Sequence, residues 1–218
     1  MRGLWLATAA ALSGCWIYSE DREPERARRR SADPDAGAGG SGGDAGAGGA
    51  DAPPTCQERR TSYPAGPYGA SQGAVIADLS FLDTTGAPVT LQDLRADCRY
   101  DVAVVTTSAG WCTACREEQP KLQSLFDDYA EDGGLVLVTL FEDDNYEPAD
   151  PELAADWQER YELTFPVLAD PAFGLGAYYD RDQTPMTMLL DLETMEIRRI
   201  MLGYIDADVR SLLESLLF

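Results

Sequence analysis

Residues 101–120 read DVAVVTTSAGWCTACREEQP and give the strongest indication of the fold. Residues 101–107 are rich in β-branched side chains, which is typical of a buried parallel strand. Cys112 and Cys115 follow as a CxxC pair. Apolar residues then recur at the spacing of one helical face, at Leu122, Leu125, Phe126 and Tyr129. The CxxC pair is therefore predicted to lie where a buried strand passes into the N-terminus of a helix.

This position makes the first cysteine of the pair reactive. The free N–H groups and the dipole of a helix N-terminus stabilise an anion, so they lower the pKa of Cys112. The thiolate is the nucleophilic form of cysteine. Cys115 lies one turn further along and is shielded by the helix. The pattern therefore predicts a redox-active dithiol in which Cys112 attacks first.

The rest of the chain alternates strands with helices. Further strands are expected at residues 135–141, 165–168, 186–190 and 197–202, with a hairpin formed by residues 79–82 and 88–91. Two more helices are expected to begin at the caps Asp150 and Asp206. This order predicts an α/β fold with a central mixed sheet flanked by helices.

The N-terminus has the features of an export signal. Arg2 precedes an apolar run at residues 4–12, which is too short to span a bilayer as a permanent helix. An ordinary signal peptide, with no role for the cysteine that follows, would show the same features. Export would place the protein where disulfides persist.

The residues Leu12-Ser13-Gly14-Cys15 resemble the lipobox of bacterial lipoproteins. The resemblance implies that residues 1–14 are removed as a signal peptide and that Cys15 carries the lipid. In Gram-negative families a residue other than Asp after the lipidated cysteine favours the outer membrane, and Trp16 stands there. We therefore expect a lipid-anchored protein of the outer membrane that faces the periplasm.

Composition divides the mature chain into a tether and a domain. Residues 31–54 consist almost wholly of Gly, Ala, Ser, Asp and Pro, which offer too little apolar surface to form a core. We expect residues 15–54 to be a flexible tether and residues 55–218 to be the single folded domain, which is long enough for one sizeable core.

Charge and the absence of histidine exclude several functions. Of the net charge of −21, −19 belongs to residues 55–218, which hold 30 Asp and Glu and 11 Lys and Arg. Such a surface repels phosphate backbones, so nucleic-acid binding is not expected. The chain has no histidine, which removes imidazole both as an acid–base catalyst and as a metal ligand. No cofactor and no metal are expected.

The five cysteines fall into three groups. Cys15 is assigned to the lipid and Cys112 and Cys115 to the dithiol, which leaves Cys56 and Cys98. The simplest interpretation is a structural disulfide between these two. The alternative is a four-cysteine zinc site, although such sites usually contain two closely spaced pairs.

Three motifs resemble the thioredoxin superfamily, and within it the TlpA/ResA-like periplasmic branch and its AhpC/TSA-type relatives. They are WCTAC at residues 111–115, REEQP at 116–120 and Thr184-Pro185. The resemblance covers about residues 73–218. It implies a thioredoxin-like fold with an N-terminal β-hairpin and an inserted strand–helix unit between residues 135 and 168.

The same resemblance implies roles for the residues of the dithiol. Cys112 would be the attacking thiolate and Cys115 the buried resolving thiol. Glu118 matches a buried glutamate of this branch that assists proton transfer at the resolving cysteine. Thr106 stands where cytosolic thioredoxins have a buried Asp, so Glu118 would supply this proton chemistry alone.

The resemblance also implies a substrate groove beside the dithiol. Trp111 would stack next to the site, and Pro185, after Thr184, would be a cis proline that faces the two cysteines. The residues between the cysteines, Thr113 and Ala114, lack the proline that is common in the reductases, so the redox potential does not follow from the motif.

The residues and the resemblance together predict an enzyme, a thiol–disulfide oxidoreductase tethered in the cell envelope. Its expected partners are protein thiols and disulfides and an electron donor; the expected direction is reduction and the expected state a monomer. Two alternatives stay open. A peroxiredoxin-type peroxidase would carry a Thr where this chain has Ala109. A non-catalytic envelope scaffold would have an inert dithiol.

Overall fold

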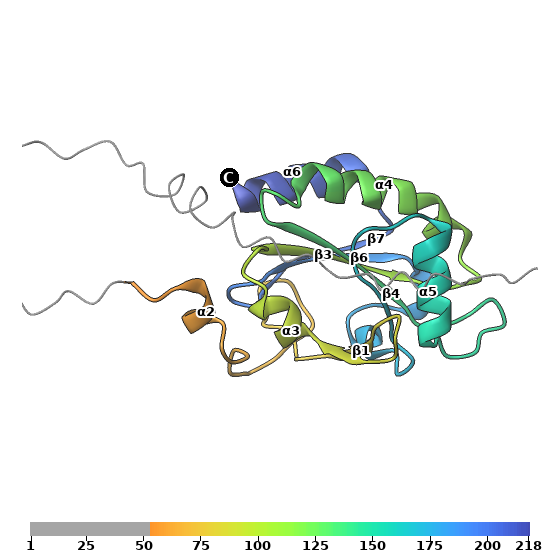
Figure 1. The fold of residues 1–218 in the computed structure, drawn as a ribbon, viewed down its shortest axis with the longest axis horizontal. Helices are drawn as coiled ribbons and strands as arrows, with labels where there is room; N and C mark the ends of the chain where they lie inside the picture. The colour runs from red at the N-terminus through yellow and green to blue at the C-terminus, as the bar shows by residue number, and fades with distance from the viewer. Residues whose placement is uncertain (1–52) are drawn as a thin grey trace, which may run out of the picture. The chain divides into compact units, whose positions relative to one another are not determined.

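The computed structural model describes residues 53–218 (Figure 1). The predicted signal peptide at residues 1–14, the predicted lipid site at Cys15 and almost all of the predicted tether lie outside these residues. Within residues 53–218, no helix is both long enough and apolar enough to cross a membrane.

A mixed sheet forms the centre of the described part of the chain. Its strands are β1 (Ser80–Leu82), β2 (Pro88–Thr90), β3 (Val102–Ser108), β4 (Gly134–Leu140), β5 (Val167–Ala169), β6 (Met186–Asp191) and β7 (Ile197–Leu202). They lie in the order β2-β1-β5-β4-β3-β6-β7. β3, β4 and β5 are parallel, whereas β6 and β7 on one side and β1 and β2 on the other are antiparallel. The predicted α/β fold with a mixed sheet is confirmed.

Helices cover both faces of the sheet. They are α2 (Cys56–Arg59), α3 (Leu91–Ala96), α4 (Thr113–Tyr129), α5 (Pro151–Arg160) and α6 (Asp206–Leu217), together with the short 3-10 helices η1 (Gly174–Ala177) and η2 (Arg181–Gln183). Figure 1 shows α4 and α6 side by side along one face and α3 on the opposite side.

Alternation along the buried strands divides the interior into two cores. Val102 and Val104 of β3 point into the core under α4 and α6, whereas Ala103 and Val105 point into the core under α3. Every residue of β3 and β4 is buried. This burial on both faces explains why the two strands are continuous apolar runs in the sequence.

Two local predictions need correction. β5 begins at Val167 and not at Phe165, because Pro166 has no N–H to donate to the sheet. Asp206 is the first residue of α6 and not its cap, since Ile205 holds the cap position without a side-chain hydrogen bond. The carboxylate of Asp206 instead accepts a hydrogen bond from Tyr204 Oη at 2.9 Å.

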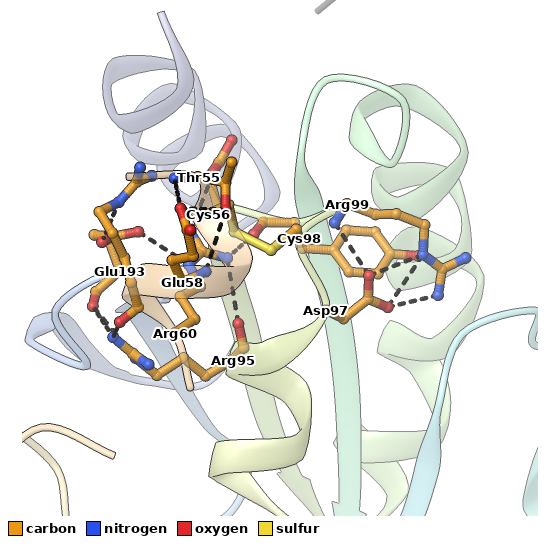
Figure 2. The surroundings of a disulfide bond; sticks show 12 residues. Thr55, Cys56, Glu58, Arg60, Arg95, Asp97, Cys98, Arg99 and Glu193 are labelled. Atoms are coloured by element: carbon orange, nitrogen blue, oxygen red, sulfur yellow. Dashed lines mark hydrogen bonds and ion pairs between the residues drawn. A yellow bond between two sulfur atoms is a disulfide. The ribbon is translucent and has the colours of Figure 1, made fainter. Parts of the chain in front are cut away.

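A disulfide joins Cys56 to Cys98 and ties α2 to the segment before β3 (Figure 2). Arg60 and Arg95 lie beside it, 2 % and 4 % exposed. Both guanidinium groups hold the β6–β7 turn at Glu193: Arg60 Nε donates to its carboxylate at 3.0 Å and Arg95 Nη2 to its carbonyl at 3.0 Å. Because the two cysteines are 42 positions apart, the cross-link stabilises the fold by roughly 3–4 kcal/mol in the chain-entropy model.

The second disulfide lies beyond the other end of β3. Cys98 precedes the first residue of this strand, Val102, and Cys112 follows the last, Ser108. The four cysteines of the described chain are thus two separate pairs. This arrangement does not support the alternative of a four-cysteine zinc site.

Candidate active site

Cys112 occupies the N-cap of α4, where its Sγ accepts a hydrogen bond from the backbone N–H of Cys115 at 3.1 Å. The two cysteines are disulfide-bonded, with their Cα atoms 5.3 Å apart. Cys112 is 4 % exposed and Cys115 is fully buried. The sulfur at the helix N-terminus therefore belongs to the less buried of the two cysteines.

The surroundings of Cys115 are almost entirely protein. Its Sγ lies 3.9 Å from the carbonyl oxygen of Thr107 on β3, and its side chain belongs to the core between the sheet and α4. Thr106, on the adjacent position of β3, is also buried, and its hydroxyl has no hydrogen-bond partner within the described chain. A threonine cannot titrate, so it cannot exchange a proton with the thiol.

Glu118 lies one turn beyond Cys115 on the buried face of α4 and is 4 % exposed. Its Oε1 has no hydrogen-bond partner within the described chain. Burial raises the pKa of Glu118 to about 8, against a smaller opposing effect of Lys121. At neutral pH this carboxyl is mostly protonated, and it can exchange a proton close to physiological pH.

The peptide bond between Thr184 and Pro185 is cis. The loop that carries it leads into β6, which is the antiparallel partner of β3. The N–H of Met186, directly after Pro185, donates to Thr107 Oγ1 at 3.0 Å. Because Cys115 Sγ contacts the carbonyl of the same Thr107, the dithiol and the proline loop lie at one edge of the sheet.

Trp111 directly precedes Cys112 and lies at the same end of the sheet. Its ring stacks on the ring of Tyr146 with centroids 5.6 Å apart, and it meets Phe141 edge-on at 6.1 Å. The side chain of Tyr146 is 62 % exposed. Its backbone has a positive φ of 66°. The ring of Trp111 thus stacks on an exposed aromatic ring.

Gly110 allows the loop after β4 to approach the dithiol closely. A Cβ at this position would lie 2.5 Å from the backbone nitrogen of Asp144 and 2.6 Å from the backbone carbon of Asp143. The N–H of Gly110 also donates to the carbonyl of Glu142 at 2.8 Å. Any side chain at Gly110 would push the two loops apart.

Two arginines near the dithiol are neutralised by carboxylates. Arg116 pairs with Asp144 at 2.6 Å, and Arg181 pairs with Glu142. Their positive charges are therefore partly offset, and the free N–H groups at the start of α4 are a further source of positive potential at Cys112.

The sequence motifs located the dithiol, Glu118, Trp111 and the Thr184-Pro185 loop but missed Glu142, Arg181 and Tyr146. One signal pointed to Glu142. It is a charged residue two positions after the end of a buried parallel strand, β4, and the carboxyl ends of such strands commonly carry functional side chains.

Comparison with known proteins identifies the family of this chain and several relatives. Residues 73–200 match the model of the AhpC/TSA family. The thioredoxin-like protein YneN of Bacillus subtilis is 29% identical over 123 residues, which cover 56% of this chain and 67% of that protein. The thiol-disulfide oxidoreductase ResA of Geobacillus kaustophilus is 28% identical over 146 residues, which cover 66% of this chain and 77% of that protein.

Solved structures show the same fold. A secreted thiol-disulfide isomerase from Corynebacterium glutamicum has a TM-score of 0.55 and 22% identity, over 66% of this chain and 85% of that one. A DsbF homologue from Corynebacterium diphtheriae has a TM-score of 0.54 and 22% identity, over 66% and 87%. The chain therefore belongs to the AhpC/TSA family, in which it is a thiol–disulfide oxidoreductase of thioredoxin-like fold.

Proposed function

We propose that this oxidoreductase reduces disulfides in other proteins of the cell envelope, with Cys112 as nucleophile and Cys115 as resolving thiol. The observation that carries the proposal is the asymmetry of the pair. Cys112 lies at the helix N-terminus with some exposure, whereas Cys115 is fully buried against β3. Only Cys112 is placed both to be a thiolate and to meet a substrate.

The reaction proceeds by two thiol–disulfide exchanges. The Cys112 thiolate attacks one sulfur of the substrate disulfide, and the other substrate sulfur leaves as a thiolate. Cys115, after losing its proton, then attacks Cys112 Sγ in the mixed disulfide. This step releases the second substrate thiol and leaves Cys112 and Cys115 oxidised. A separate protein dithiol, the electron donor, returns the pair to the reduced form.

We assign to Glu118 the role of accepting the proton that the Cys115 thiol loses. Resolution requires the thiolate of a buried cysteine, so a base must take the proton. Glu118 lies three residues further along the same helical face, and its raised pKa of about 8 suits a group that exchanges protons with a thiol. Thr106, which replaces the acid of other thioredoxins, offers no alternative base.

The charges around the site favour reduction. A strongly oxidising pair is one whose reduced thiolate is unusually stabilised, and nearby cations would do this. Here Arg116 and Arg181 are both paired with carboxylates, so among the described residues the N-terminus of α4 is the group that we expect to stabilise the Cys112 thiolate most. This arrangement is expected to keep the potential low and the dithiol reducing.

A lipid anchor on Cys15 would hold the enzyme in the envelope, on the outer membrane and facing the periplasm. The lipobox-like residues 12–15 support the anchor. The described relative from Corynebacterium glutamicum is a secreted protein, which agrees with export. A monomer is sufficient for the proposed reaction, since one chain supplies both cysteines, Glu118 and the Thr184-Pro185 loop.

The order of attack can be tested by trapping. In the Cys115→Ser variant the mixed disulfide through Cys112 cannot be resolved, so covalent adducts with envelope proteins should accumulate. Non-reducing gels followed by mass spectrometry would detect them, and addition of dithiothreitol should release them. The matched Cys112→Ser variant should give no adducts. Equal trapping by both variants, or trapping by Cys112→Ser alone, would contradict the assignment.

Replacement of Glu118 by Gln should slow resolution and simplify its pH dependence. In the native enzyme the rate should rise with pH through about 8, as Glu118 loses its proton and becomes a base. The Gln variant should lack this rise, which stopped-flow measurements of mixed-disulfide decay would show.

The stability of the same variant gives a second readout. The folded-state pKa of Glu118 lies above its ordinary value of 4.5, so the folded protein binds the extra proton between about 4.5 and about 8. Glu118 therefore makes the native enzyme lose stability as pH rises through this window, and Glu118→Gln should remove that loss. If both profiles match the native enzyme, Glu118 has no such role.

The anchor can be tested separately. Cys15→Ser should move the protein from the membrane fraction to the soluble fraction, because each buried methylene of an acyl chain contributes about 0.8 kcal/mol to membrane binding. Ser31→Ala, a change in the same predicted tether, should leave the protein in the membrane fraction. A Cys15→Ser protein that stays with the membrane would show that the anchor lies elsewhere.

A further inference from the structure

Glu142 is a charged residue in a buried place beside the dithiol. It lies two residues after the end of β4, behind Phe141, and is 8 % exposed. Its Oε2 accepts a hydrogen bond from Trp111 Nε1 at 2.9 Å and one from Arg181 Nη2 at 2.5 Å. Its backbone carbonyl accepts the N–H of Gly110 at 2.8 Å. Both its main chain and its side chain thus hold the segment that leads into Cys112.

Arg181 connects this carboxylate to the proline loop. It begins η2, the short helix directly before Thr184. Its carbonyl accepts the backbone N–H of Thr184 at 3.2 Å and the hydroxyl of Thr184 at 2.7 Å. A continuous series of contacts therefore runs from Trp111 through Glu142 and Arg181 to Thr184 and Pro185.

The position of this ion pair indicates a role in geometry more than in stability. The side chain of Arg181 is 45 % exposed, so solvent screens much of its attraction to Glu142. The pair nevertheless joins the loop that follows β4 to the loop that leads into β6. Charge-assisted hydrogen bonds fix direction as well as distance, and Glu142 accepts one from Trp111, after β3, and one from Arg181, before β6.

We propose that Glu142 is a positioning residue that holds the Thr184-Pro185 loop at a set distance from Trp111 and so fixes the width of the groove for a protein substrate. The proposal rests on the proposed function, since it takes the two loops as the walls of a substrate groove. Glu142 itself does not touch the reacting sulfurs. Glu142 therefore affects the binding of a peptide chain that contacts both walls of the groove. It does not affect the reaction of a small disulfide that contacts Cys112 alone.

The first test compares two substrates in the Glu142→Gln variant. Gln keeps an acceptor for Trp111 but loses the ion pair with Arg181. For insulin, a disulfide-bonded protein probe, KM should rise by up to about tenfold with kcat within about twofold, because binding must then order a loop that the ion pair no longer holds, and one hydrogen bond to a charged group sets the upper limit of that cost. For dithiobis(nitrobenzoate), a small aromatic disulfide, kcat/KM should stay unchanged.

Variants of Arg181 show whether the pair acts as a unit. Arg181→Gln should raise the KM for insulin as Glu142→Gln does, and the double variant should be no worse than either single one. Arg181→Lys, which keeps the charge, should restore part of the loss. The matched control is Glu196→Gln, which breaks the ion pair with Arg198 at the end of the sheet remote from the dithiol and should change neither substrate.

Hydrogen exchange separates this proposal from the proposed function. In Glu142→Gln, amides of residues 180–184 should exchange faster, whereas those of β3 should not change. This result is required whether or not the native enzyme reduces insulin; failure to reduce insulin would count against the proposed function alone. Unchanged exchange at residues 180–184, an unchanged KM for insulin, or an equal loss with both substrates would each overturn the role of Glu142.

Discussion

The N-terminus of α4 pointing at Cys112 Sγ is the interaction on which the rest of this structure depends. The N–H of Cys115 donates to that sulfur at 3.1 Å, and the helix dipole favours negative charge there. β3 delivers the chain to this point from the interior, with all of its residues buried. A strand fixed on both faces holds the helix start rigidly, which a reactive site requires.

The groups that complete the site come from the ends of neighbouring strands. The dithiol follows β3, Glu142 follows β4, and the cis proline precedes β6. β3 and β4 are parallel and β6 is antiparallel to β3, so these three strand ends meet at one edge of the sheet. The Cys56–Cys98 disulfide, before the start of β3, lies beyond the opposite end of that strand. The disulfide that stabilises the fold and the disulfide of the CxxC pair thus lie at opposite ends of the same strand.

Sequence patterns were sufficient where structure is local and periodic. The apolar run at β3 and the helical spacing of α4 placed the CxxC pair correctly, and the alternating elements gave the α/β fold. α2 and α3 were missed because helices of 4 and 6 residues are too short to show a period. Their only signals are capping boxes, such as the one formed by Thr55 and Glu58.

The contacts of Glu142 could not be predicted in the same way. Its partners Trp111 and Arg181 are 31 and 39 positions away in the sequence, so no local pattern links them. The burial of Glu118 came from a family resemblance, whereas its raised pKa follows from desolvation in the structure. The contacts of Glu142 and the pKa of Glu118 therefore depend on tertiary packing, which brings distant loops together and which the sequence motifs do not describe.

The midpoint potential of the Cys112–Cys115 couple tests the central claim most directly. We propose that the N-terminus of α4, with the nearby cations Arg116 and Arg181 paired to carboxylates, makes this dithiol a reductant. Equilibration with a glutathione or dithiothreitol buffer should give a value near that of thioredoxin, about −270 mV, where each 30 mV changes the equilibrium tenfold. A value near that of DsbA, about −120 mV, would make the pair an oxidant and would contradict the account.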